Sequence, residues 1–417
     1  MDFRDTPEDA AFRTEVKAFL ASEFKEGPGT ASGPNAERAS EEVGRVGVDR
    51  FGAYKGWMKK LAAKGWIAPA WPQEYGGAGM TVMQQFVFNE EMAKARAPRP
   101  GGIGVGFAGP TIIVYGNEAQ KKDHLPGILS GEDVWCQGFS EPGSGSDLAS
   151  LQTSAAKDGD DYVINGQKIW TSGAQFAQRM ILLARTDPAA PKHKGISYFL
   201  LDMKSPGVTV RPLVNMANTP GFSEVFFDNV RVPAKDLLGE ENRGWYVATT
   251  TLDFERSSIG ASIAQQHSVE DLIAFAKAQG ARSQEPGKNG NGAVSPSVRT
   301  ELAERSIEAE TARLLSYRVI SMQHRGMVPN HEASAIKLYA AELSQRVAST
   351  GVKVAGLYGQ LDRDGKVPAE AATNRYAPNK GRLMRTYLNA VSATIAGGTG
   401  EVNRNIIAGR GLGLPRD

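Results

Sequence analysis

The stretch YVINGQKIW, residues 162–170, carries the clearest strand signal in the chain. Apolar residues flank Asn165-Gly166, a dipeptide typical of a two-residue β-hairpin turn, so a hairpin is expected here. The stretch lies inside a strand-rich region that extends from about residue 134 to 235. Further short apolar runs in this region are bounded by Gly, Pro or Asp and predict more strands: RMILLAR, GISYFLLDM, GVTVRPL and SEVFFDNVRVP.

Helical periodicity precedes and follows this β region. Apolar residues recur at helical spacing before it in 7–24, 80–97 and 117–131, where Pro126 predicts a break. After Gly244 the same spacing predicts helices in 245–278, 297–325, 331–358 and 380–396, whereas 280–296 has no apolar period and predicts a loop. This order argues against a doubly wound sheet, which needs alternating strands and helices. It predicts three domains: helical at 1–133, β at 134–236 and helical at 237–417.

Composition limits the function classes only broadly. The chain has 417 residues, 41% of them hydrophobic, and a net charge of +2, which is ordinary for a large globular protein. No apolar run is long enough to cross a bilayer, and the N-terminus lacks the pattern of a signal peptide. A single cysteine, Cys136, excludes an intrachain disulfide and fits a reducing compartment, so a cytoplasmic protein is expected. The five histidines show no metal-binding spacing, and no basic segment is interleaved with aromatics, so neither a metal site nor nucleic-acid binding is predicted.

GVGFAG, residues 104–109, formally matches the dinucleotide-binding pattern GxGxxG. That pattern binds a pyrophosphate only after a strand and directly before a helix. The flanking RAPRPGGI and PTIIVYG predict neither element, so no nucleotide site is expected here.

Four segments combine small residues with chemically useful side chains. WCQGFSEPGSGSDLAS (135–150) is either a cradle for an anion or polar ring edge, or a surface turn. Trp170 in GQKIWTSGAQ (166–175) either borders an aromatic cofactor or belongs to the core. The acids of TTTLDFERSSIGAS (249–262) either complement a helix dipole or include a base beside a cavity. TIAGGTGEVNRN (394–405) is either a plain turn or backbone that approaches a ligand.

Taken together, these segments resemble the acyl-CoA dehydrogenase family. GFSEPGSGSDLAS fits the family's first signature, and GGTGEVNRNIIAGRGLGLPR resembles its C-terminal signature. KIWTSGA, FFDNVRVP and YGNEAQKKDHLPGILSGE also resemble family segments in the family's order, so the likeness covers essentially the whole chain. The resemblance implies an α+β multidomain fold with an N-terminal α-helical domain, a middle β-barrel and a C-terminal four-helix bundle.

The resemblance also implies an activity. Family members use FAD to remove two hydrogens across Cα–Cβ of an acyl-CoA thioester, and electron-transferring flavoprotein collects the electrons. A homotetramer is implied, with an α2β2 heterotetramer as an alternative. Carried over by position, the FAD contacts are Gln137, Phe139, Ser140, Gly145, Ser146, Trp170, Thr171, Ser172, Arg282, Thr399 and Glu401. Ser146, Asp253 and Arg256 are implied to contact the acyl-CoA.

Two positions depart from the family pattern. Many members carry Arg-x-x-Phe-Gly after the first bundle helix, and here Arg282 is the available substitute. Many members also place the catalytic Glu directly before the Gly-Thr of the C-terminal signature, where this chain has Gly397. The isovaleryl-CoA and long-chain branches place the base in a sequence like Asp-Leu-Glu-Arg, which resembles Asp253-Phe254-Glu255-Arg256 here. The resemblance therefore implies Glu255 as the base, with the Gly397 N–H donating to the thioester carbonyl.

Two other functions fit the same fold. A flavin monooxygenase needs no α-proton base, so the presence of Glu255 argues against it. A non-catalytic or FAD-poor partner subunit of a heteromeric acyl-CoA dehydrogenase fits the missing Arg-x-x-Phe-Gly. The acyl group is left open between short branched, long linear and steroid side-chain thioesters, because no local motif reports the depth of a cavity.

Overall fold

The computed structural model describes residues 5–24, 48–255, 260–282, 295–361 and 382–415. These residues form two compact units, which are treated separately below. The first contains the described residues up to Gln85 and those from Pro98 to the end of helix α7. The second contains Phe86–Ala97 and the described residues from Gly260 onward.

The helices of the first unit are α1 (Pro7–Glu23), α3 (Val48–Ala63), α5 (Gly109–Tyr115), α6 (Glu118–Ser130) and α7 (Gly244–Glu255), and α4 (Val82–Lys94) begins in it. The Thr6 Oγ1 caps α1 by accepting a hydrogen bond from the Asp9 N–H at 3.1 Å. The Phe19 ring then packs edge-on against Trp66, with 5.0 Å between ring centroids. The break expected at Pro126 is wrong, because α6 continues through it with Leu125 and Ile128 buried on one face.

The GVGFAG stretch forms a π-helical turn, Gly104–Ala108, that continues directly into α5. The expectation that no helix follows it is therefore wrong. The segment before it, from Ala95 to Gly101, contains no strand, so the context of a dinucleotide-binding motif is absent at this place.

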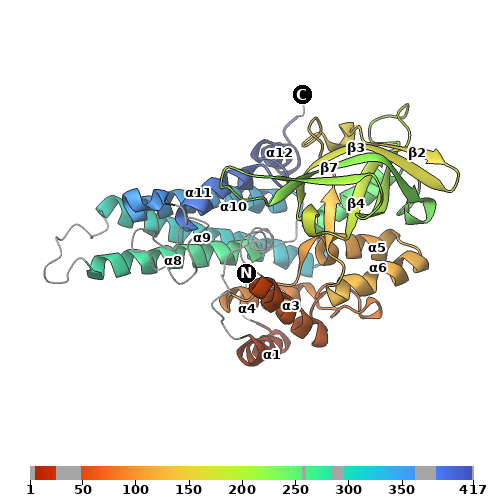
Figure 1. Ribbon diagram of the computed structural model, residues 1–417. Coiled ribbons are helices and arrows are strands. Elements are labelled where there is room, and N and C mark those ends of the chain that lie inside the picture. Colours follow the sequence, from red (N-terminus) through yellow and green to blue (C-terminus); the bar gives the residue numbers. More distant parts are fainter. Residues whose placement is uncertain (1–4, 25–47, 256–259, 283–294, 362–381, 416–417) are drawn as a thin grey trace. The chain divides into compact units, whose positions relative to one another are not determined.

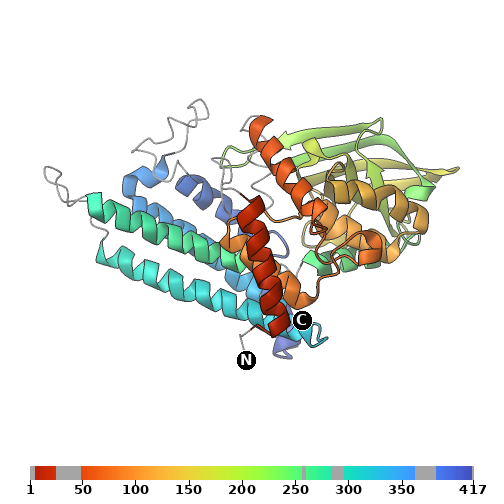
Figure 2. The ribbon, with the colours of Figure 1, turned by 90° about the horizontal axis from the view of Figure 1, so that it is seen from below.

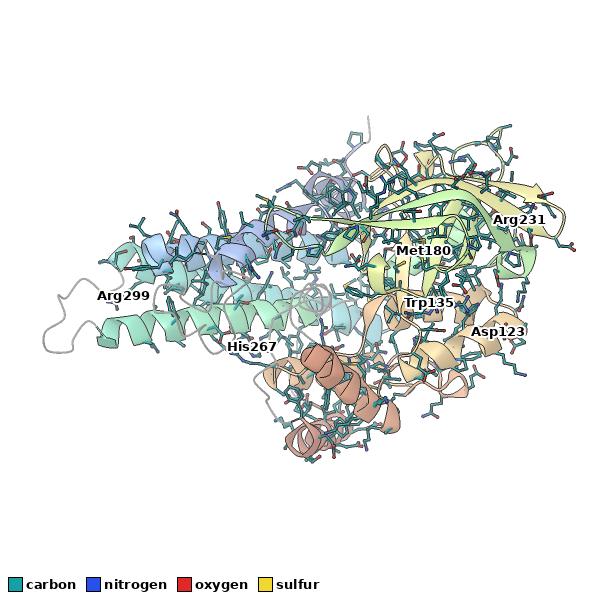
Figure 3. All side chains as sticks on the ribbon, viewed as in Figure 1. Asp123, Trp135, Met180, Arg231, His267 and Arg299 are labelled. Carbon is teal, nitrogen blue, oxygen red and sulfur yellow. The ribbon has the colours of Figure 1, made fainter. Side chains whose placement is uncertain are left out.

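The strands of the first unit form one sheet (Figure 1). They are β1 (Trp135–Gly138), β2 (Ser154–Asp158), β3 (Asp161–Ser172), β4 (Arg179–Arg185), β5 (Ile196–Asp202), β6 (Val208–Leu213) and β7 (Phe222–Pro233). Their order is β1-β4-β2-β3-β7-β6, and β5 pairs with β4. Each run predicted from the apolar pattern is a strand. The core of the sheet includes the fully buried Met180, labelled in Figure 3, and Phe199 packed on Tyr162.

The hairpin expected at Asn165-Gly166 is wrong, because both flanks belong to the single strand β3. The turn lies earlier, at Gly159 and Asp160, between the paired residues Asp158 and Asp161. Asn165-Gly166 instead marks a shift of register against β7, which is a β-bulge. The backbone at this dipeptide forms a bulge in the strand without reversing it.

The second unit is built on α8 (Gly260–Arg282), α9 (Pro296–His324), α10 (His331–Ala355), α11 (Arg382–Ala390) and the short α12 (Gly400–Ile406). Helices α8, α9 and α10 contact one another around a core that includes Leu272, Leu302 and Leu343 (Figure 2). The helices predicted at 297–325, 331–358 and 380–396 are confirmed as α9, α10 and α11. The helix predicted at 245–278 is helical in its described parts, α7 and α8, and residues 256–259 between them lie outside the described residues. Most of the predicted loop 280–296 also lies outside the described residues.

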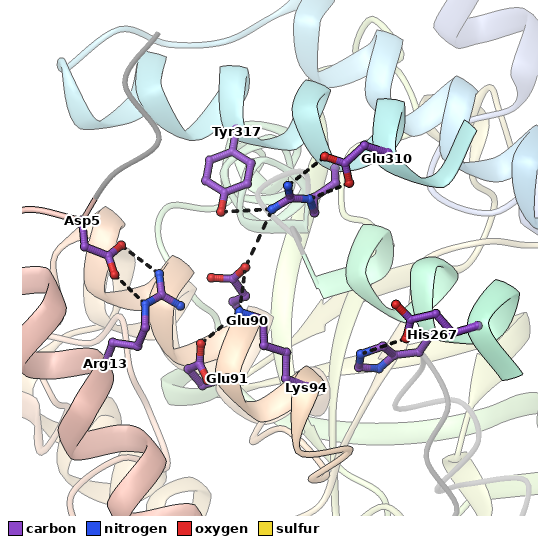
Figure 4. A network of polar contacts seen from close by, with 10 residues as sticks. Asp5, Arg13, Glu90, Glu91, Lys94, His267, Glu310 and Tyr317 are labelled. Atoms are coloured by element: carbon purple, nitrogen blue, oxygen red, sulfur yellow. Dashed lines mark hydrogen bonds and ion pairs between the residues drawn. The ribbon is translucent and has the colours of Figure 1, made fainter. Parts of the chain in front are cut away.

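A polar network joins the end of α4 to α9 within the second unit (Figure 4). Lys94 lies 3.2 Å from the buried carboxylate of Glu90, and Arg313 Nη1 lies 4.0 Å from the same group. Arg313 also makes two hydrogen bonds to Glu310, at 2.8 and 2.9 Å, and one to the Tyr317 hydroxyl at 3.4 Å. The bond to Glu310 raises the pKa of Arg313. Positive charges therefore lie around the buried Glu90 carboxylate, and they offset the free-energy cost of burying its charge. None of the helices in the described ranges has the length and apolar content needed to cross a membrane.

The bulge in β3 leads to a testable expectation for stability. A Cβ at Gly166, whose φ is +144°, would lie 2.7 Å from Thr153 Cα. Gly166→Ala should therefore lower the free energy of unfolding by roughly 2–4 kcal/mol, the sum of backbone strain and overlap. Gly159→Ala is the matched control, because no atom lies within 4 Å of its Cβ, and it should cost about 1 kcal/mol. Urea unfolding measures both, and equal losses would contradict a bulge that needs glycine.

Candidate active site

The small-residue loop follows β1 directly and begins with a tight turn. The Glu141 and Ser144 backbones exchange two N–H···O bonds of 3.0 Å each, and Gly145 and Ser146 are exposed beyond the turn. The Ile169 N–H of β3 donates to the Ser140 carbonyl at 2.9 Å. This bond brings the loop beside the end of β3, so two segments predicted to contact FAD lie together.

A buried ion pair fixes the loop to β3. Lys168 is fully buried, and its Nζ lies 2.8 Å from Glu141 Oε1 and 3.0 Å from the Phe139 carbonyl. The Glu141 carboxylate also accepts the Gln152 N–H at 2.6 Å and the Thr153 N–H at 2.9 Å. Four hydrogen bonds therefore tie the loop's first residues to β3 and to the segment before β2.

Both members of this pair are charged at neutral pH. Burial alone would raise the pKa of Glu141, but the charge and hydrogen bond of Lys168 and the two N–H donors hold it below its usual range. Burial lowers the pKa of Lys168 to about 8, although Glu141 opposes this shift. Such a pair fixes geometry strongly, because removing one partner leaves the other as an uncompensated buried charge.

At the end of β3 the chain presents an aromatic ring and a hydroxyl in unusual states. Trp170 has a left-handed backbone, with φ +60°, at a second shift of register against β7, and its side chain is 59% exposed. The next residue, Thr171, is fully buried, and its Oγ1 has no hydrogen-bond partner among the described residues. Ser172 follows and is half-buried. Strained backbone and unpartnered buried hydroxyls concentrate where a protein binds a ligand, so these residues fit the edge of a planar polar ring system.

The C-terminal glycine-rich segment lies in the second unit. Gly397 and Gly398 both have positive φ, +66° and +90°, which strains any other residue. Thr399 Oγ1 caps α12 by accepting the Val402 N–H at 3.2 Å. The buried Asn403 side chain donates to the carbonyls of Gly398 and Thr399, each at 2.9 Å. Hydrogen bonds from Val402 and Asn403 therefore hold this loop, and Gly397 and Gly398 are exposed to solvent.

Glu401 is the acid in this loop, and its environment makes it a poor base. Hydrogen bonds from its own backbone N–H and from Thr399 lower its pKa. It lies with Thr399 on the wall of a hollow of about 500 Å³, whose lining also includes Glu342, Arg346 and Arg404. A carboxylate that holds its proton weakly suits an acceptor for a ligand hydroxyl better than it suits proton abstraction.

For the remaining predicted site residues, the structure describes the backbone position alone or nothing. Asp253 and Glu255 belong to the last turn of α7, and Arg282 is the last residue of α8. Their side chains and the whole of Arg256 lie outside the described residues. The first unit thus brings Phe139 and Ser140 beside the part of β3 that leads to Trp170, Thr171 and Ser172, and the roles of these residues stay predictions.

Glu141 and Lys168 are the structurally important residues that the sequence reasoning missed. A signal was present in the sequence. Lys168 lies on the inward face of β3, which also carries Tyr162 and Ile164. A lysine on the apolar side of a strand needs a buried counter-charge. The identity of that partner, 27 residues earlier, does not follow from spacing alone.

Comparisons with known proteins identify the class of enzyme. The N-terminal, middle and C-terminal acyl-CoA dehydrogenase domain families match residues 6–132, 136–230 and 242–412. The chain therefore belongs to the acyl-CoA dehydrogenase family, and its architecture of helical, β and helical parts is the family's fold. It is an acyl-CoA dehydrogenase, a flavoprotein oxidoreductase of lipid catabolism.

Several relatives match over nearly the whole chain. The acyl-CoA dehydrogenase IpdE1 of Mycobacterium tuberculosis is 35% identical over 413 residues, 97% of this chain and 98% of the relative. FadE26 of the same organism is 34% identical over 423 residues, 99% and 98% of the two chains. Among solved structures, the Tcur3481-Tcur3483 steroid ACAD is 34% identical, with a TM-score of 0.80 and full coverage of both chains. The ChsE4-ChsE5 complex from Mycobacterium tuberculosis is 32% identical, with a TM-score of 0.79 and full coverage.

The ion pair predicts a specific loss of stability. Lys168→Met leaves Glu141 buried without its counter-charge and should lower the free energy of unfolding at neutral pH by about 3–5 kcal/mol. The double variant with Glu141→Gln should recover part of this loss. The matched control is Lys192→Met, which removes the exposed 2.9 Å pair with Asp147 and should cost less than about 1 kcal/mol.

Acidification tests the same pair. The pKa of Glu141 lies below its ordinary value of 4.5. The charged carboxylate therefore contributes to the free energy of unfolding above pH 4.5, and this contribution is lost as the pH falls below that value. In urea unfolding, the gap in stability between wild type and Glu141→Gln should therefore close in acid. A gap that is independent of pH would contradict a charged pair.

Proposed function

We propose that the chain binds FAD at the loop after β1 and the end of β3, and there oxidises an acyl-CoA thioester to the trans-2-enoyl-CoA. The observation that carries this proposal is the buried, unpartnered Thr171 hydroxyl beside the exposed, strained Trp170. The ion pair of Glu141 and Lys168 holds the loop carbonyls and N–H groups beside these two residues. When bound, FAD supplies the acceptor for the substrate's β-hydride.

The chain's own residues perform the proton chemistry. Glu255, at the end of α7, abstracts the α-proton, because Gly397 has no side chain to do so and hydrogen bonds lower the pKa of Glu401. The Gly397 N–H donates to the thioester carbonyl, which stabilises the negative charge that develops on that oxygen as the α-proton leaves. Ser146, Asp253 and Arg256 contact the acyl-CoA in this proposal, and Arg282 contributes to the FAD site.

The acyl group is proposed to be bulky. A relative of similar overall structure supports this assignment, since it is named a steroid ACAD. Gly397 also leaves volume where a side chain would otherwise approach the α-carbon. A steroid side-chain thioester is therefore the first candidate, and electron-transferring flavoprotein is the proposed acceptor of the electrons.

A second candidate is a partner subunit in a mixed assembly. The Tcur3481-Tcur3483 and ChsE4-ChsE5 structures are each named as a pair of different chains. This favours a mixed assembly over the homotetramer expected from the family. The chain purified alone distinguishes the two, since an FAD-poor partner subunit would be colourless and would bind flavin only with its partner.

The assignment of the base is tested by Glu255→Gln. The variant should stay yellow, because the proposed FAD contacts are unchanged, and its flavin should fail to bleach when acyl-CoA is added without oxygen. A loss of at least about 10²-fold in the rate of flavin reduction is expected. Glu240→Gln, an exposed acid before α7, is the control and should bleach normally. Normal bleaching by Glu255→Gln would rule out this residue as the base.

The role of Gly397 in substrate choice is tested by Gly397→Ala. The added methyl should reduce kcat/KM for a bulky acyl-CoA by about 10–200-fold more than for a short linear one. The ratio between the two substrates is the measurement, because any backbone strain in the variant affects both alike. An unchanged ratio would show that this position does not limit the size of the acyl group.

A further inference from the structure

Three consecutive threonines of α7 each bond to a carbonyl of their own helix and differ in their other contacts. Among the described residues, Thr249 Oγ1 bonds only within the helix, to the Tyr246 carbonyl at 2.8 Å. Thr250 Oγ1 lies 2.8 Å from the Tyr115 hydroxyl at the end of α5. Thr251 is fully buried and joins a hydroxyl cluster of the first unit. Of the three threonines, Thr251 is therefore the one that holds the buried face of the helix through hydrogen bonds.

The hydroxyl cluster consists of Thr251, Thr111 and Tyr198, all fully buried. Thr251 Oγ1 lies 2.9 Å from Thr111 Oγ1 and 3.4 Å from the Tyr198 hydroxyl. Thr111 Oγ1 donates to the Phe107 carbonyl at 2.7 Å, in the π-helical turn before α5. Thr251 Oγ1 also lies 3.1 Å from the Val247 carbonyl of its own helix. Each hydroxyl has one proton, and the Phe107 and Val247 carbonyls together with the neighbouring hydroxyls give each of the three an acceptor.

This cluster connects the helix that carries Glu255 to the loop predicted to bind FAD. The Tyr198 ring, on β5, packs edge-on against Phe139, with 5.9 Å between centroids. Phe139 is also the residue whose carbonyl accepts a hydrogen bond from Lys168. Burial raises the pKa of Tyr198, so its hydroxyl stays a neutral donor.

The other end of α7 is fixed against the same strand. A Cβ on Gly244, the first residue of α7, would lie 2.4 Å from the Ser197 carbonyl carbon of β5. The helix therefore starts in direct contact with the β5 backbone and is tied again, two turns later, through Thr251 to the next residue of the strand. Two attachments fix both the direction and the rotation of α7 on this part of the sheet.

We propose that Thr251, Thr111 and Tyr198 are positioning residues for the dehydrogenation. Thr251 stands four residues before Glu255, so it lies about one turn before the last residue of α7. The cluster sets the rotation and height of the last turn of α7 against Phe139, and through it sets the base against the flavin loop. The inference rests on the proposed function, because it needs Glu255 as the base.

The test compares Thr251→Val with Thr251→Ser, with Thr249→Val as the matched control. Valine keeps the shape of threonine and removes the hydroxyl, whereas serine keeps the hydroxyl. Thr251→Val should slow flavin reduction at saturating acyl-CoA by about 10–100-fold, with KM unchanged, because a misplacement of about 1 Å can cost this much. Thr251→Ser should restore most of the rate, and Thr249→Val should behave as wild type.

A kinetic isotope effect separates positioning from general damage. With substrate deuterated at the α-carbon, Thr251→Val should show a larger isotope effect than wild type, because proton abstraction becomes the slower step. If Thr251→Val does not fold, Tyr198→Phe decides, since it keeps the ring against Phe139 and should change the rate and isotope effect in the same direction. A folded variant with the rate and isotope effect of Thr249→Val would overturn the inference.

The failure of this inference is distinguishable from the failure of the proposed function. Normal flavin bleaching by Glu255→Gln removes the proposed function and the positioning role with it. An inactive Glu255→Gln together with a fully active Thr251→Val removes only the positioning role.

Discussion

The site of this enzyme depends on the buried ion pair between Glu141 and Lys168. The loop after β1 consists largely of small residues, and this pair adds side-chain contacts to the backbone bond from Ile169 to Ser140. The pair joins that loop to β3 through the Phe139 carbonyl and to the segment before β2 through two backbone N–H groups. Lys168 links the loop to β3, and Glu141 links it to the segment before β2, so the pair sets the relative positions of three segments.

The same arrangement explains why strain can persist nearby. Trp170 is held with a left-handed backbone and an exposed ring, two states that cost free energy. The strand residues before it are fixed by Lys168 and by the bond from Ile169 to Ser140, so the bulge cannot relax without breaking these contacts. The fixed residues Lys168 and Ile169 therefore hold the strained Trp170 in place. Binding sites are commonly supported in this way by a rigid element of the fold.

The fold was largely predictable because its signals are local. Short apolar runs bounded by turn residues identified β3 to β7, and helical spacing identified α9, α10 and α11. The errors arose where local signals compete with tertiary contacts. Asn165-Gly166 has the composition of a turn, but pairing with β2 and β7 on both sides keeps the strand continuous. Pro126 disfavours a helix, but burial on either side of it maintains α6.

The candidate site was predictable only in part. The glycine- and serine-rich loop and the Trp170 segment could be found because their composition is unusual. The partners that position them, Glu141 and Lys168, are ordinary residue types far apart in sequence. No spacing rule links them, since the contacts depend on which strands and helices become neighbours.

A structure of the chain with FAD and a non-reactive acyl-CoA analogue tests the central claim most directly. The quantity to measure is the distance from the Glu255 carboxylate to the α-carbon of the analogue. The proposed mechanism predicts about 3–3.5 Å, a distance at which proton transfer is possible, with the flavin edge against Thr171 and Ser172. A flavin bound elsewhere, or a different acid in contact with the α-carbon, would contradict it.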